Sequence, residues 1–175
     1  LVHVGERVGI VGPNGSGKTT LLDELVRAGS WENSVLRVGP SMRVGYCAQQ
    51  RGRIPEQTSV LDAMLSAGSF TRNEIFGVLS RLRFEWGDLD RPVGSLSGGE
   101  WNRLQLAIAI IARANLLILD EPTNHLDIPS REAVEEALGE FTGTIITVSH
   151  DRYFLDAVAT SIVELADRTL CRYEG

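Results

Sequence analysis

Gly12-Pro13-Asn14-Gly15-Ser16-Gly17-Lys18-Thr19 is the stretch of this sequence that decides its fold. The stretch matches the pattern G-x-x-x-x-G-K-[ST], in which a glycine-rich turn joins a strand to a helix. Both neighbours are predicted here, because 7–11 has the pattern of a short buried strand and 18–28 that of a helix. The glycines let the backbone wrap a phosphate, Lys18 supplies a cation, and the Thr19 hydroxyl can bind Mg²⁺. The stretch therefore predicts a phosphate site.

Short apolar runs alternate with helical patterns along the rest of the chain. Further strands are predicted at 35–38, 42–47, 116–119, 143–148 and 162–173, and helices at 60–67, 73–83, 99–113, 129–138 and 153–158. Buried strands that alternate with helices form a mainly parallel sheet between helices, so the fold class is α/β. We expect a single domain over 1–175, with a helical subdomain at 50–97.

The composition excludes several classes of protein. The chain has 175 residues, 43% hydrophobic and 23% charged, which is ordinary globular usage. Cys47 and Cys171 show no metal-ligand or disulfide spacing, so we expect a reducing, cytoplasmic compartment. The longest apolar run, 106–112, is far shorter than the roughly 20 residues of a membrane span. The net charge of −6 argues against nucleic-acid binding by the whole surface and leaves local basic patches open.

Two adjacent carboxylates follow the aliphatic run 116–119. Asp120 and Glu121 are expected at the carboxyl end of a parallel strand, the edge where ligands of α/β sheets bind. Asp120 would hold Mg²⁺, directly or through water, and Glu121 could take a proton from an attacking water. Alone, such a pair is weak evidence, because strands that run into helices often carry acidic caps. Beside the loop at 12–19, it predicts the acidic half of a P-loop NTPase site.

A second glycine-rich turn precedes the helix predicted at 99–113. Ser97, Gly98 and Gly99 would present a hydroxyl and backbone N–H groups at a helix N-terminus, which is a second anion site. Ser97 and Glu100 also stand at the spacing of a capping box, so the segment could be a plain helix cap. Both interpretations stay open.

Five motifs, in this order and spacing, resemble those of an ATP-binding cassette (ABC) nucleotide-binding domain. They lie at 12–19, 46–49, 96–100, 116–121 and 148–152. The string Glu121-Pro122-Thr123-Asn124-His125-Leu126-Asp127 is the form seen in the ABC-F subfamily, as is the continuation at 153–156. The resemblance covers essentially the whole chain.

The resemblance implies roles for individual residues. Glu121 would be the general base, His150 would contact the γ-phosphate, and Gln49 would reach both Mg²⁺ and the attacking water. Mg²⁺ would be held by Thr19, Gln49 and Asp120. The phosphates of ATP would be lined by Gly12, Pro13, Asn14, Gly15, Ser16, Gly17, Lys18, Thr19 and Thr20.

The resemblance also implies a composite site shared with a second cassette. One domain leaves the γ-phosphate half-exposed, and the partner's Ser97, Gly98 and Gly99 would supply the missing donors. Asp127 would communicate between the two sites. Hydrolysis removes the group that joins the halves, which makes a two-state clamp.

An ABC-F cassette would work in ribosome-linked translation regulation or antibiotic resistance, with the ribosome or its RNA as a partner. The ATP-binding subunit of an ABC membrane transporter is the alternative. Family members stack adenine on an aromatic residue that precedes the first strand, and no such residue precedes Leu1. We therefore expect an N-terminally truncated cassette that partly lacks its antiparallel strands.

Overall fold

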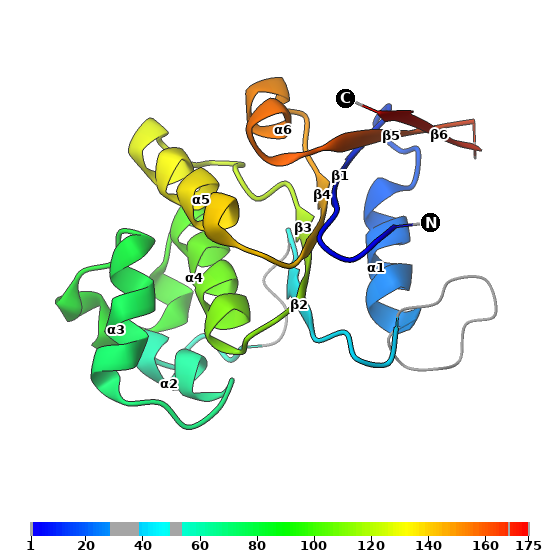
Figure 1. Cartoon of the computed structure of the whole chain (residues 1–175). Helices are drawn as coiled ribbons and strands as arrows, with labels where there is room; N and C mark the ends of the chain where they lie inside the picture. The colour runs from blue at the N-terminus through cyan, green and yellow to red at the C-terminus, as the bar shows by residue number, and fades with distance from the viewer. Residues whose placement is uncertain (1, 29–38, 50–53, 168, 175) are drawn as a thin grey trace.

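A computed structural model describes residues 2–28, 39–49, 54–167 and 169–174 (Figure 1). The strand predicted at 35–38 lies outside these ranges. The strands are β1 (Arg7–Val11), β2 (Val44–Cys47), β3 (Leu116–Asp120), β4 (Thr144–Val148), β5 (Ser161–Ala166) and β6 (Thr169–Glu174). The helices are α1 (Lys18–Ala28), α2 (Val60–Leu65), α3 (Arg72–Arg81), α4 (Gly98–Ile111), α5 (Ile128–Glu140) and α6 (Arg152–Val158), with 3₁₀ turns η1 (Trp86–Asp90) and η2 (Val93–Ser95).

The strands form one mixed sheet in the order β2-β3-β4-β1-β5-β6. All pairs are parallel except β5 and β6, which pair antiparallel. The segment predicted as closing strands thus folds into a hairpin, whose turn includes Asp167 at a φ of 48°. The α/β class with a mainly parallel sheet is confirmed.

Helices cover both faces of the sheet, and β3 supplies side chains to both. Leu117 and Leu119 belong to the larger core cluster, which includes residues of α4, α5 and α6. Ile118 points the other way, into the smaller cluster with Leu22 of α1. Every residue of β3 and β4 is buried, as expected of central strands covered on both sides. In Figure 1, α1 lies on the opposite side of the sheet from α4 and α5.

The segment between β2 and β3 is helical in its described part. Side chains of α2, α3 and η1 pack around α4, and Ile75, Leu79 and Leu89 are fully buried. The loop expected at 87–95 contains the two 3₁₀ turns, because Leu89 and Val93 are drawn into this core. None of the helices in the described ranges has the length and apolar character that crossing a bilayer needs.

Candidate functional site

The glycine-rich loop connects β1 to α1. Gly12 has a φ of 152°, and a Cβ there would lie 2.3 Å from the backbone oxygen of Leu165, so only glycine fits. The loop curls back over the side chain of Lys18, whose Nζ donates hydrogen bonds of 2.9 Å to the carbonyl oxygens of Gly12 and Pro13. Lys18 is buried. Its ammonium is therefore held inside the loop, at the first residue of α1.

A cavity of about 600 Å³ opens beside this loop. It lies where β1, β3 and β4 end, at the edge of the sheet where α/β proteins bind ligands. Its walls are Asn14, Gly15, Gly17, Lys18, Thr19, Thr20, Gln49, Asp120, Glu121, Asn124, Val148 and His150. Four separate segments of the sequence therefore converge on one cavity.

Asp120 is the last residue of β3, lines this cavity and is 3% exposed. Burial raises the pKa of its carboxyl group, while a hydrogen bond with the Thr19 side chain acts in the opposite direction. Its Oδ2 is buried and has no hydrogen-bond partner within the part of the chain that the structure describes. An orphaned carboxylate oxygen beside a hydroxyl is a donor set that suits Mg²⁺, which prefers oxygen ligands.

Glu121 adopts a φ of 52°, a left-handed conformation that is uncommon outside glycine and often found at functional sites. Its N–H donates to the backbone oxygen of Val148, which fixes the residue against the end of β4. Oε2 accepts a hydrogen bond of 3.4 Å from the backbone N–H of His150, and His150 Nε2 lies 3.6 Å from Oε1. Burial raises the pKa of Glu121. The carboxylate is aimed at the cavity beside an exposed imidazole.

Of the remaining residues of the predicted site, Gly12, Pro13 and Ser16 belong to the glycine-rich loop but do not line the cavity, and the others lie elsewhere. Ser97 caps α4: its hydroxyl accepts from the N–H of Glu100, and the Glu100 carboxylate accepts from the N–H of Ser97. The capping box predicted from the spacing of Ser97 and Glu100 is therefore formed in the structure. Gly99 packs so tightly against the chain at 125–126 that a Cβ would lie 2.8 Å from Leu126. Asp127 is exposed and caps α5 by accepting from Ser130 N–H. The walls of the cavity include none of Ser97, Gly98, Gly99 and Asp127.

Two further cavity residues had no assigned role at the sequence level. Asn124 lies in the string 121–127, whose position directly after the acidic end of β3 was the available signal. Val148 is the last residue of β4 and contributes to the wall from the strand end. Its hydrophobic side chain gave no signal of a site.

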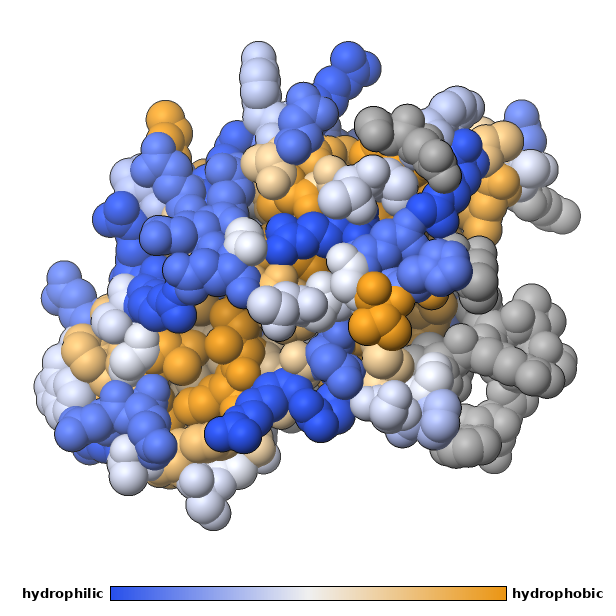
Figure 2. Space-filling model, in the orientation of Figure 1, coloured by the Kyte–Doolittle hydropathy of each residue, from blue (hydrophilic) through white to orange (hydrophobic). Residues whose placement is uncertain are grey.

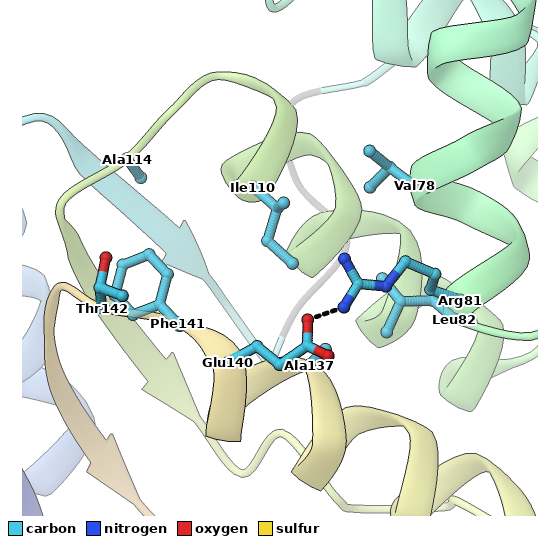
Figure 3. Close-up of a pocket in the computed structure, with 9 residues that line it drawn as sticks. All are labelled: Val78, Arg81, Leu82, Ile110, Ala114, Ala137, Glu140, Phe141 and Thr142. Atoms are coloured by element: carbon cyan, nitrogen blue, oxygen red, sulfur yellow. Dashed lines mark ion pairs between the residues drawn. The ribbon is translucent and has the colours of Figure 1, made fainter.

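A second, smaller cavity of about 250 Å³ lies among α3, α4 and α5 (Figure 3). Apolar side chains such as Val78, Ile110 and Phe141 form most of its wall, and apolar surface shows between polar side chains over α3 and α4 in Figure 2. Its titratable lining residues, Arg81 and Glu140, form an ion pair with each other. None of the described residues that line it is an unpaired acid or base, so the cavity beside α1 is the stronger candidate for chemistry.

Comparisons with known proteins agree with this geometry. The family described as ABC transporter matches residues 2–124, which contain the glycine-rich loop, α4 and the acidic end of β3. This chain belongs to the ABC transporter family. His150 and Asp127 lie beyond the matched segment of this cassette, while matches to individual relatives extend further.

Curated relatives resemble nearly the whole cassette. ABC transporter F family member 5 from Arabidopsis thaliana is 40% identical over 177 residues, which cover 99% of this chain and 26% of the relative. The ribosome protection protein VmlR from Bacillus subtilis is 40% identical over 160 residues, 91% of this chain and 29% of the relative. The chain thus spans less than a third of the length of these relatives.

Solved structures share the architecture of the cassette. A dimeric ATP-binding cassette in a post-hydrolysis state, bound to ADP and Pi, superposes with a TM-score of 0.80. The match covers 99% of this chain and 87% of that one, at 21% sequence identity, and it shows the fold alone.

Proposed function

We propose that this cassette binds ATP with Mg²⁺ in the cavity beside α1 and hydrolyses it as one half of a dimerising clamp. One observation carries the proposal. The buried Lys18 cation and the carboxylates of Asp120 and Glu121 line one cavity at a helix N-terminus. Burial raises the pKa values of Asp120 and Glu121, and carboxyl groups perturbed in this way and gathered in a cavity are typical of catalytic sites.

The phosphates would be held by the loop and by the first turn of α1. Lys18 Nζ now rests on two carbonyl oxygens, and a phosphate would give the same ammonium a charged partner, which makes a stronger hydrogen bond. Backbone N–H groups and the positive end of α1 add further attraction. The proposed contacts are those of Gly12, Pro13, Asn14, Gly15, Ser16, Gly17, Lys18, Thr19 and Thr20.

The proposed Mg²⁺ ligands are oxygens of Thr19, Asp120 and Gln49. The orphaned Oδ2 of Asp120 and the neighbouring Thr19 hydroxyl support this set, and Gln49 reaches the same cavity from the end of β2. Mg²⁺ typically takes one or two carboxylates together with the phosphates of the substrate. Bound there, it would neutralise negative charge on the phosphates during transfer.

Glu121 is proposed as the general base. The raised pKa of Glu121 increases its affinity for a proton, and its buried Oε1 has no hydrogen-bond partner among the described residues, which leaves this oxygen to accept a proton from a water. His150 is held to Glu121 through its backbone and is 57% exposed at the side chain, which leaves its ring available to the γ-phosphate. Glu121 would thus orient and deprotonate the water, while His150 contacts the group that is transferred.

Ser97, Gly98, Gly99 and Asp127 would act on the ATP of a second cassette, since their own cavity does not include them. The dimeric ATP-binding cassette with the same fold supports such a pairing. We further propose a cytoplasmic role in translation or antibiotic resistance at the ribosome, supported by the likeness to a ribosome protection protein. The family description keeps a transporter subunit as the second candidate.

The test of hydrolysis is Glu121→Gln, which keeps the shape of the side chain and removes the base. We expect turnover of Mg–ATP by the full chain to fall at least about 100-fold while ATP still binds. Glu140→Gln makes the same chemical change at the smaller cavity among α3, α4 and α5, and it should leave turnover unchanged. Wild-type turnover in Glu121→Gln would refute the base assignment.

Co-purification separates the two cellular roles. A full-length protein with Glu121→Gln should remain ATP-bound and therefore clamped. Sedimentation of this variant with ribosomes in the presence of ATP supports the translation role. Recovery with a membrane permease instead would establish the transporter alternative.

A further inference from the structure

Gln105 lies on α4, outside the walls of the ATP cavity, yet it holds the backbone next to one of the cavity's residues. Its side-chain Oε1 accepts a hydrogen bond of 3.0 Å from the backbone N–H of Ala48. Its Nε2 donates one of 3.1 Å to the backbone oxygen of the same residue. Ala48 directly precedes Gln49, which lines the cavity.

The packing of β2 against α4 explains how the glutamine reaches this backbone. Gly45 of β2 lies so close to the helix that a Cβ there would be 2.5 Å from the Cβ of Ala109. Ala109 and Gln105 are four residues apart and share one face of α4. The close approach at Gly45 therefore places the Gln105 amide level with Ala48, just beyond the end of the strand.

The paired hydrogen bonds satisfy both polar groups of the Ala48 backbone in the way a neighbouring strand would. Two bonds to one residue fix its orientation as well as its position, whereas one bond would leave it free to rotate. The direction of the next residue, Gln49, then depends on α4 as well as on the pairing of β2 in the sheet.

We propose that Gln105 is a positioning residue that sets the place of Gln49 in the ATP cavity by tying its backbone to α4. This inference rests on the proposed function, because it matters only if Gln49 acts on Mg²⁺ and water. It also joins two motifs physically, since α4 begins at the Ser97 cap about two turns before Gln105. A displacement of α4 would be transmitted to Gln49 through the Ala48 backbone.

The first test is the variant Gln105→Leu, which keeps a similar shape and removes both hydrogen bonds. Hydrogen exchange of the Ala48 amide in the full chain should accelerate at least about 10-fold, because its acceptor is gone. Gln57→Leu makes the same substitution at an exposed glutamine and should leave Ala48 exchange unchanged. Unchanged exchange in Gln105→Leu would overturn the proposal without reference to ATP turnover.

The second test separates positioning from mere stability. Gln105→Leu should lower kcat about 10-fold or more while the Kd for ATP, set by the loop at α1, changes less than about twofold. The double variant with Gln49→Ala should be no slower than Gln49→Ala alone, because both act through the same group. A normal kcat, or losses that multiply in the double variant, would refute the proposal. Absence of turnover in the wild type would refute the proposed function instead.

Discussion

The N-termini of α1 and α4 are built from the same kinds of residue and end in different states. Each has a serine and two glycines at its start: Gly15, Ser16 and Gly17 precede α1, whereas Ser97 precedes α4 and Gly98 and Gly99 are the first residues of that helix. At α4 the serine hydroxyl and the Glu100 carboxylate satisfy each other's backbone N–H groups. At α1 the hydroxyl of Ser16 is buried and finds no hydrogen-bond partner in the described ranges, and the helix start faces a cavity.

The residue three positions after the serine accounts for the difference. It is Glu100 at α4, long enough to reach back to the cap, and Thr19 at α1, whose hydroxyl instead bonds to Asp120. Arg91 holds Glu100 further, at 2.8 Å, and also pairs with Asp88. The start of α4 is therefore a closed end, capped by its own chain, whereas the start of α1 is an open end that faces a cavity.

The largest expected effect is at the open end. Lys18→Ala should weaken ATP binding about 100-fold, because a charged hydrogen bond to phosphate contributes roughly 1.5–3 kcal/mol. Lys18 is also the only lysine in the sequence, so ATP should protect it from amine-reactive labelling that mass spectrometry can locate. Titration with a fluorescent ATP analogue would measure the affinity.

Lys18→Arg is the matched control for charge. The guanidinium is larger and planar, so it should recover only part of the affinity inside the narrow loop. Full affinity in Lys18→Ala would show that the open helix start is not a phosphate site, and the contrast with α4 would lose its functional meaning.

At the closed end, Glu100→Gln tests the charge. Burial opposes ionisation, but hydrogen bonds from Arg91 and Ser97 and the charge of Arg91 together lower the pKa of Glu100 to about 2 from 4.5. The stabilisation is therefore fully present above pH 4.5 and is lost as the pH falls toward 2. Since the side chain is 23% exposed, water screens part of the attraction, and we expect a loss of about 1 to 1.5 kcal/mol at pH 7.

Urea unfolding of the wild type and Glu100→Gln at several pH values checks this expectation. The difference in unfolding free energy should shrink below pH 4.5, in step with protonation of Glu100 in the unfolded chain. A difference that stays constant down to acid pH would mean that the charge of Glu100 does not stabilise the cap.

Ser97→Ala removes the other half of the capping box. Loss of an N-cap hydroxyl typically costs about 1 kcal/mol, which for a chain of this size lowers the Tm by roughly 2–4 °C. ATP binding by the same chain should be unchanged, because Ser97 does not line its cavity. Calorimetry together with the fluorescence titration separates the two effects. Weakened binding within one chain would contradict the separation of the two helix ends.

Most of the helices and strands could be predicted from the sequence, because the hydrophobic periodicity of each can be recognised within a short segment. The bounds predicted for β1 and α1 agree with the structure, since the glycine-rich loop marks the end of one and the start of the other. The 3₁₀ turns at η1 and η2 were missed because Gly87 and Pro92 favour a loop locally, while burial of Leu89 and Val93 orders the segment. Tertiary packing there overrides local preference.

The site was harder to predict where contacts join distant segments. The capping-box spacing of Ser97 and Glu100 was visible in the sequence, but whether the cap forms depends on the folded backbone. Gln105 looks like an ordinary polar residue on a helix, and its two bonds to Ala48 exist only because Gly45 admits α4 so closely. The roles proposed for the cavity residues stay predictions until the variants are measured.

Ser16→Ala is the smallest and sharpest contrast with Ser97→Ala. A buried hydroxyl without a partner costs desolvation, so its removal should leave stability unchanged or raise it by up to about 1 kcal/mol. Ser16 does not line the cavity in this structure, so its proposed phosphate contact requires the hydroxyl to turn toward the ligand. Loss of that one neutral hydrogen bond should lower ATP affinity only severalfold, because Lys18 remains. Urea unfolding and ATP titration of both variants would then show that Ser97→Ala lowers stability and leaves binding unchanged, whereas Ser16→Ala weakens binding and does not lower stability. If Ser16→Ala instead unfolds as easily as Ser97→Ala, the serine before α1 is a structural cap, and the two helix starts do not differ in the way proposed.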